Sequence, residues 1–82
     1  MWEYAWYAPS EGWYSDFQYS SYFEASENAV HCALIWLRSR RLGYKGTLPR
    51  DKKTIEKLWR SMRRRGWEIR KRKKKDQSQE NM

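Results

Sequence analysis

Residues 51–72, DKKTIEKLWRSMRRRGWEIRKR, predict a helix, a stop and a strand in direct succession. Apolar residues recur in the first part at three- and four-residue steps and form one stripe of an amphipathic helix: Ile55, Leu58, Trp59 and Met62. Asp51, or Thr47 before it, has a side chain suited to capping the start of this helix. We expect the helix to run to about Arg65.

The end of this stretch predicts a strand. Gly66 is the residue type that most often ends a helix. Trp67 to Arg72 then alternate in character, which predicts a short strand with Trp67 and Ile69 facing the core. Such a strand lies at a sheet edge or pairs with strands elsewhere in the chain.

The first 23 residues predict a β-hairpin. Residues 2–7 alternate aromatic side chains with others, and aromatic residues have high β-propensity. Residues 8–12, Ala-Pro-Ser-Glu-Gly, have the composition of a turn. Alternation resumes from Trp13 to Phe23, which we interpret as the second strand. An all-helical fold is the alternative, and it requires these 23 residues to be irregular.

A second, more apolar helix is predicted between the hairpin and residue 51. Ser26 can cap it, Gly43 can stop it, and the helical spacing is carried by Val30, Ala33, Leu34 and Leu37. Apolar residues surround most of its circumference, which favours a helix packed on two sides or one that also serves a subunit interface.

The expected element order is therefore β-β-α-α-β, a small α+β fold. We expect one domain over residues 1–72, because 82 residues suffice for one small core and not for two. Residues 73–82 lack apolar periodicity and predict a disordered basic and polar tail.

Composition narrows the class of protein. The single cysteine, Cys32, cannot form an internal disulfide, so six tryptophans and six tyrosines must supply much of the core. The N-terminus lacks the basic region of a secretory signal, and no apolar run is long enough to cross a bilayer. We expect a cytoplasmic protein without a membrane partner.

Charge is sharply segregated along the chain. All 18 lysines and arginines lie between Arg38 and Lys75, whereas residues 1–37 hold five acids and no basic side chain. Residues 38–75 contain only three acids and so carry a net charge of about +15. Solubility does not require so large an excess, which disfavours the compact state by self-repulsion. This charge pattern favours a protein that binds a polyanion, although runs of basic residues also occur as solvated surfaces without a ligand.

We predict that the protein is a small, non-enzymatic nucleic-acid-binding protein that contacts phosphates through its second helix and final strand. The predicted contact residues are Lys53, Lys57, Arg60, Arg63, Arg64, Arg70, Arg72 and Lys73. Secondary contacts are expected from Arg38, Arg40 and Arg41, although cations in the last turn of a helix also suit its dipole without any ligand.

The acidic, aromatic N-terminal part suggests a different partner. Exposed rings there could stack on unpaired bases, but core packing and repulsion by the five acids oppose that role. A protein interface or homodimer contact is the hypothesis we attach to Trp2, Tyr4, Trp6, Trp13 and Tyr14. A small size with this charge asymmetry is also common among proteins of phages and mobile elements. The alternative function is therefore a compact, phage-type modulator or inhibitor that binds a host or partner protein through its aromatic sheet or its Arg-rich helix.

Catalytic and metal signatures are sparse, so we predict no enzyme activity, metal or cofactor. His31 is the only histidine, which leaves neither a multi-histidine metal site nor spare candidates for a Ser-His-Asp triad. No glycine-rich phosphate loop is present. We interpret His31 as a partly buried helix residue and Cys32 as a small core residue.

Overall fold

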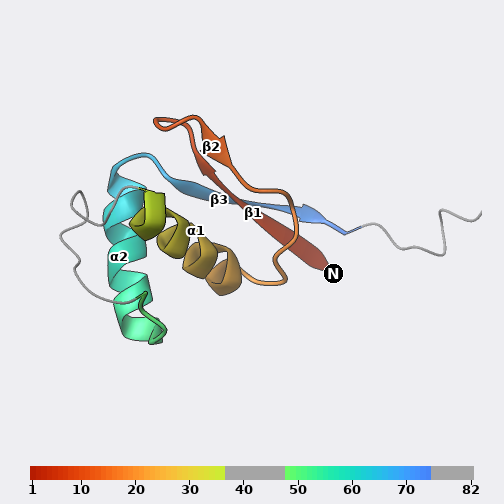
Figure 1. Ribbon diagram of the computed structural model, residues 1–82. Coiled ribbons are helices and arrows are strands. Elements are labelled where there is room, and N and C mark those ends of the chain that lie inside the picture. Colours follow the sequence, from red (N-terminus) through yellow and green to blue (C-terminus); the bar gives the residue numbers. More distant parts are fainter. Residues whose placement is uncertain (37–47, 75–82) are drawn as a thin grey trace, which may run out of the picture.

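The computed structural model describes residues 1–36 and 48–74. The elements are β1 (Trp2–Ala8), β2 (Trp13–Tyr14), α1 (Tyr22–Trp36), α2 (Lys52–Arg64) and β3 (Glu68–Lys73). Both helices lie on one side of a three-stranded sheet (Figure 1). At one end of the sheet, the paired strands β1 and β3 extend past the helices. The predicted β-β-α-α-β order of an α+β fold is confirmed, and the all-helical alternative is wrong.

The sheet has the order β2-β1-β3 and is antiparallel throughout. β3 pairs with the whole length of β1, from Trp2 opposite Lys73 to Tyr7 opposite Glu68. The final strand is therefore both paired with the hairpin and placed at a sheet edge. Because strand side chains alternate between faces, Trp6 and Ile69 share the face that packs on the helices.

The second strand is much shorter than predicted. Only Trp13 and Tyr14 pair regularly with β1, and one further bridge joins Tyr19 to Tyr4. Between them the Ser15 hydroxyl accepts the Trp6 N–H in place of a strand carbonyl, which interrupts the ladder. Exposed and partly buried residues still alternate from Trp13 to Phe23. The alternation in the sequence therefore predicted which side chains face solvent, but not a regular pairing of strands.

Helix α1 begins at Tyr22, earlier than predicted, and Ser26 is not its cap. Ser26 is buried inside the helix and donates its hydroxyl to the Phe23 carbonyl. The Ser21 hydroxyl instead accepts the Glu24 N–H at 3.1 Å, while the Glu24 carboxylate accepts from the Ser20 N–H and hydroxyl at 3.0 and 2.6 Å. In a strict capping box the carboxylate accepts the N–H of the cap residue itself, here Ser21. Glu24 instead accepts from Ser20, one residue earlier, and we refer to this variant as the capping box.

The capping box predicts a pH-dependent contribution to stability. The Ser20 hydroxyl and N–H hold the pKa of Glu24 below its ordinary value, so the contribution is present at neutral pH and is lost as the pH falls through the folded-state pKa. We expect Glu24→Gln to unfold at lower denaturant concentration than the wild type at pH 7. This difference should disappear in acid. Denaturation at several pH values measures it, with Glu27→Gln on the same helix as control; a difference independent of pH would contradict the cap.

Helix α2 starts and ends as its sequence predicts. The Asp51 carboxylate accepts the Thr54 N–H at 2.8 Å, and the hydrogen bonds from Thr54 lower the pKa of Asp51. At the other end, Gly66 has φ of +100°. Trp67 donates its N–H to the Met62 carbonyl and Gly66 donates to the Arg63 carbonyl, the pattern of a Schellman motif. The chain thereby turns directly from α2 into β3.

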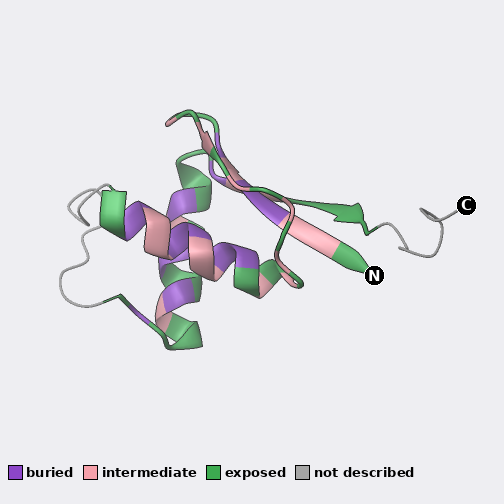
Figure 2. Cartoon of the chain, turned by 45° about the vertical axis from the view of Figure 1, so that its right-hand side comes forward, coloured by how far each residue is buried: buried purple, intermediate pink, exposed green. Residues whose placement is uncertain are grey.

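The core lies between the helices and the inner face of the sheet (Figure 2). Trp6 is 3 % exposed and stacks on Trp67 with ring centroids 5.4 Å apart. Asn28 of α1 joins this core to the sheet, because its side-chain oxygen accepts the Trp6 indole N–H at 2.9 Å and the Tyr19 hydroxyl at 2.6 Å. The predicted apolar stripe of α2 is buried in full, as are the three described positions of the helical spacing predicted for α1, Val30, Ala33 and Leu34.

Several predictions concern residues that the structure does not describe. Leu37 and the Gly43 stop lie outside the described residues, as do positions 75–82 of the predicted tail. The tail prediction is wrong at its first residue, since Lys73 belongs to β3 and the Lys74 N–H still donates to the Met1 carbonyl. No helix within the described ranges is long and apolar enough to cross a membrane.

Candidate nucleic-acid interface

The outer face of α2 carries a straight row of cations. Four exposed residues make up this α2 row: Lys53, Lys57, Arg60 and Arg64. At about 100° per residue they cluster opposite the buried stripe that faces the core. Lys53 and Arg64 are eleven positions apart, so the row is about 16 Å long at 1.5 Å per residue. The packing that anchors the helix thus turns all four cations to the outside.

The α2 row has no counter-charge among the residues that the structure describes. Within residues 1–36 and 48–74, no carboxylate forms an ion pair or hydrogen bond with any of its four side chains. Glu56 lies on the side of the helix between the row and the core. Because like charges at three- and four-residue steps repel, an external polyanion would relieve a repulsion that the described fold leaves in place.

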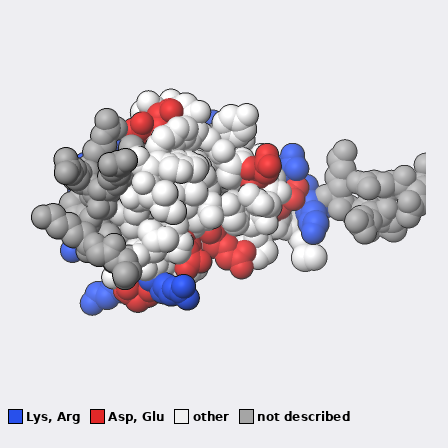
Figure 3. All heavy atoms as spheres, in the orientation of Figure 1, with Lys and Arg blue, Asp and Glu red and all other residues white. Residues whose placement is uncertain are grey.

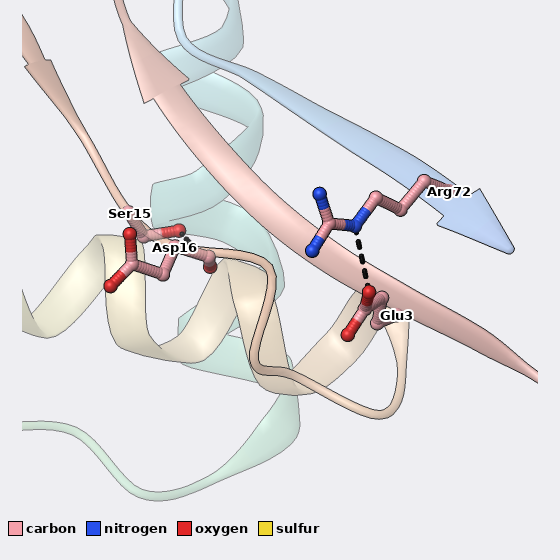
Figure 4. Close-up of polar contacts among 4 residues, drawn as sticks. All are labelled: Glu3, Ser15, Asp16 and Arg72. Atoms are coloured by element: carbon pink, nitrogen blue, oxygen red, sulfur yellow. Dashed lines mark hydrogen bonds and ion pairs between the residues drawn. The ribbon is translucent and has the colours of Figure 1, made fainter. Parts of the chain in front are cut away.

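Unlike the cations of the α2 row, the arginines of β3 have partners, because they contact carboxylates and aromatic rings on the outer face of the sheet. Arg72 Nε lies 2.7 Å from Glu3 Oε1 on β1, as Figure 4 shows, and its guanidinium sits 4.4 Å from the centre of the Phe17 ring. Arg70 pairs with Glu68 at 2.6 Å and covers the Tyr7 ring at 4.3 Å. Figure 4 also places the carboxylate of Asp16 on the segment that follows β2.

The lysines of β3 project from the other face, near the free end of the sheet. Lys71 Nζ lies 4.8 Å from the centre of the Trp2 ring, which is half exposed. Lys73 is exposed and pairs through its backbone with Trp2. These two cations face no carboxylate within the part of the chain that the structure describes.

The predicted basic groups do not merge into one strip on the visible face. In Figure 3 the basic spheres gather over the lower end of α2 and at the free end of the β1–β3 pair, and acidic spheres lie between them. The predicted contacts therefore divide into the α2 row with neighbouring Arg63, and a β3 group made of Arg70, Arg72 and Lys73. The secondary group of Arg38, Arg40 and Arg41 lies outside the described residues.

The aromatic residues assigned to a protein interface are scattered. Trp6 lies in the core, where a partner has no access to its ring. Trp13 packs edge-on against Trp36 with ring centroids 4.8 Å apart, and Tyr14 is 70 % exposed beside it. Trp2 and Tyr4 lie on β1, with Trp2 at the far end of the sheet.

Two aromatic residues beside the α2 row were placed in the wrong element by the sequence prediction. Tyr22 and Phe23 start α1 and lie next to Lys52 and Trp59 of α2. The Ser-x-x-Glu pattern of residues 21–24 was the available signal for this helix start. It was masked by the alternating aromatics of the preceding segment.

The residues considered for catalysis or metal binding have structural partners. His31 Nε2 lies 2.7 Å from the Pro49 carbonyl oxygen. This contact holds the segment that precedes α2 against α1. Cys32 contacts the core, and burial raises the pKa of its thiol. Among the described residues, no three His, Cys, Asp or Glu side chains are grouped so that they could hold a metal ion.

Comparison of the chain with protein-family models, with curated proteins and with solved structures gives no match. The function of this protein is therefore inferred from the geometry and charge of its own residues.

Proposed function

We propose that this protein is a small, non-enzymatic nucleic-acid-binding protein whose principal contact is the α2 row. The observation that carries the proposal is a line of four exposed cations, about 16 Å long, with no carboxylate partner in the described fold. Successive cations are separated by one turn or slightly less, about 4.5–6 Å along the axis. A flexible phosphate backbone can follow such a row.

The chemistry of the row suits phosphates. Arg60 and Arg64 each present a planar fork of donors that can bind two phosphate oxygens at once, whereas Lys53 and Lys57 act as point charges. Each cation that neutralises a phosphate releases a condensed counterion, so binding gains free energy that depends on salt and little on base sequence. These contacts position a nucleic acid without reading it.

The β3 group has a secondary role in this proposal. Arg70 and Arg72 must share their charge with Glu68 and Glu3, whereas Lys73 is exposed near the free end of the sheet. The β3 group therefore adds to electrostatic attraction and contributes less per residue than the α2 row. We propose a cytoplasmic location, since the one cysteine provides no internal disulfide.

A salt series tests this function. Nuclease-treated protein is titrated against fluorescent duplex DNA, single-stranded DNA and RNA between low and physiological salt. Four phosphate contacts predict a slope of log K against log salt of about −3 for single strands and about −3.6 for a duplex. Weak binding that is equal for all three probes and vanishes near physiological salt would contradict a dedicated site.

A protein partner is the second candidate, favoured by a shallow hollow lined by aromatic side chains away from the α2 row. The hollow has a volume of about 710 Å³ and is lined by Gly12, Trp13, Tyr14, Ile35 and Trp36. Its rim residues Ile35 and Trp36 are both more than half exposed, which is unusual for large apolar side chains on one patch. A specific partner captured after nuclease treatment supports this function, and loss of every partner with nuclease counts against it.

A further inference from the structure

A cleft adjoins the α2 row on the side that faces the start of α1. It has a volume of about 370 Å³, within the range of small-ligand sites. The lining residues come from two helices far apart in sequence: Tyr22, Phe23, Ser26, Lys52, Glu56, Trp59, Arg60 and Arg63. Arg60 belongs both to this cleft and to the α2 row, so the two sites are continuous.

One wall of the cleft is an aromatic ring held in a fixed position. The Tyr22 ring is 43 % exposed and meets the buried Trp59 ring edge-on, with centroids 6.3 Å apart and an interplanar angle of 79°. The Trp59 indole N–H donates to the Tyr22 hydroxyl at 2.9 Å. Because the capping box begins α1 at Tyr22, the backbone position of this ring is also fixed. The ring is thus partly accessible, and holding it in place adds no large ordering cost on binding.

The remaining walls of the cleft carry three basic side chains and one carboxylate. Lys52, Arg60 and Arg63 are exposed at the rim, and Lys52 Nζ lies 5.8 Å from the centre of the Phe23 ring. Glu56 is the one carboxylate among the lining residues. Three cations around an aromatic surface favour a ligand that is planar on one side and anionic on the other.

We propose that this cleft takes an unpaired nucleobase from a strand whose phosphates lie along the α2 row. The base stacks on Tyr22, its flanking phosphate contacts Arg60 and Arg63, and Glu56 accepts a hydrogen bond from a base amino group. This inference rests on the proposed function and narrows it to single-stranded nucleic acid. A duplex must unpair and unstack a base before it can enter the cleft, so it binds through the α2 row alone.

Single-stranded DNA and RNA share the chemistry that the cleft would recognise, and the ribose hydroxyl distinguishes them. The test therefore uses three probes of one sequence: a DNA single strand, an RNA single strand and a DNA duplex. The wild-type protein should bind at least one single strand more tightly than the duplex at the same salt concentration. Comparing the two single strands shows which sugar is preferred.

A matched pair of substitutions at one position separates stacking from folding. Tyr22→Leu keeps apolar bulk but removes the aromatic face, and we expect single-strand affinity to fall about 5- to 100-fold. Tyr22→Phe keeps the ring and removes the acceptor for Trp59, and we expect affinity within about threefold of the wild type. Duplex affinity should change little in both variants, and circular dichroism confirms that each is folded.

The outcomes distinguish the two proposals. If Tyr22→Leu is folded and binds single strands as tightly as the wild type, the base-binding cleft is wrong while the α2 row stands. Equal losses by Tyr22→Leu and Tyr22→Phe, or an equal loss on the duplex, would also overturn the cleft. If the wild-type protein binds none of the three probes at physiological salt, the proposed function itself fails.

Discussion

Reversing the charge of Arg60 and Arg64 together is expected to weaken nucleic-acid binding by roughly thirty-fold or more while the fold stays intact. Both side chains are exposed on the outer face of α2 and lack carboxylate partners among the described residues. Each close cation–phosphate contact in water is worth about 1 kcal/mol, so losing two costs about 2 kcal/mol, and the new repulsion adds to this. Fluorescence anisotropy with a labelled oligonucleotide at fixed salt measures the loss.

The matched control places the same charge change on β3. Lys71→Glu with Lys73→Glu alters the net charge by the same amount, and both lysines are exposed. We expect a clearly smaller loss of affinity than for Arg60→Glu with Arg64→Glu. If the two double variants lose the same affinity, binding follows total charge and the α2 row is not a site.

The largest effect on stability is expected at Trp6. Its ring stacks on Trp67 and its indole N–H donates to Asn28, so Trp6→Ala leaves a cavity and removes one of the two donors to the Asn28 side-chain oxygen. Truncation of a buried tryptophan typically costs about 3–5 kcal/mol. A chain of this length has a total free energy of unfolding of about 4–12 kcal/mol. We therefore expect Trp6→Ala to lose a large part of its stability, measured by urea denaturation followed by circular dichroism.

Trp2 provides the control for this substitution, because it is the same residue type on the same strand and on the same face of the sheet. It is half exposed, and the Lys71 ammonium group lies 4.8 Å from the centre of its ring. Trp2→Ala should cost less than about 1 kcal/mol. Similar losses for Trp2→Ala and Trp6→Ala would contradict the core described here.

Local patterns in the sequence predicted the second half of the fold well. The α2 stripe, the Asp51 cap, the Gly66 stop and the following strand are all confirmed. Each depends on contacts between residues close in sequence, so helical spacing and capping chemistry suffice to predict them. Such patterns also separate the outer face of α2 from its buried stripe, which is why the α2 row was predictable.

Features set by tertiary contacts were not predictable in this way. The strand expected to reach Phe23 stops at Tyr14, because the Ser15 hydroxyl accepts the Trp6 N–H in place of a strand carbonyl. The capping box that starts α1 is a local signal, but the aromatic alternation around it was interpreted as a strand. The engagement of Arg72 by Glu3 depends on a pairing between residues 69 positions apart. Alternation gives the face on which a side chain lies, but not the register that decides which charges meet.

The claim that the α2 row contacts phosphates is tested most directly by the salt dependence of binding, measured for the wild type and for the double variant Arg60→Gln with Arg64→Gln. Each lost phosphate contact lowers the slope of log K against log salt by about 0.7 to 0.9. The α2 row therefore predicts a slope smaller by about 1.5 in the double variant, on the nucleic acid that the wild type binds most tightly. An unchanged slope would show that these arginines contact no phosphate and would contradict the proposed interface.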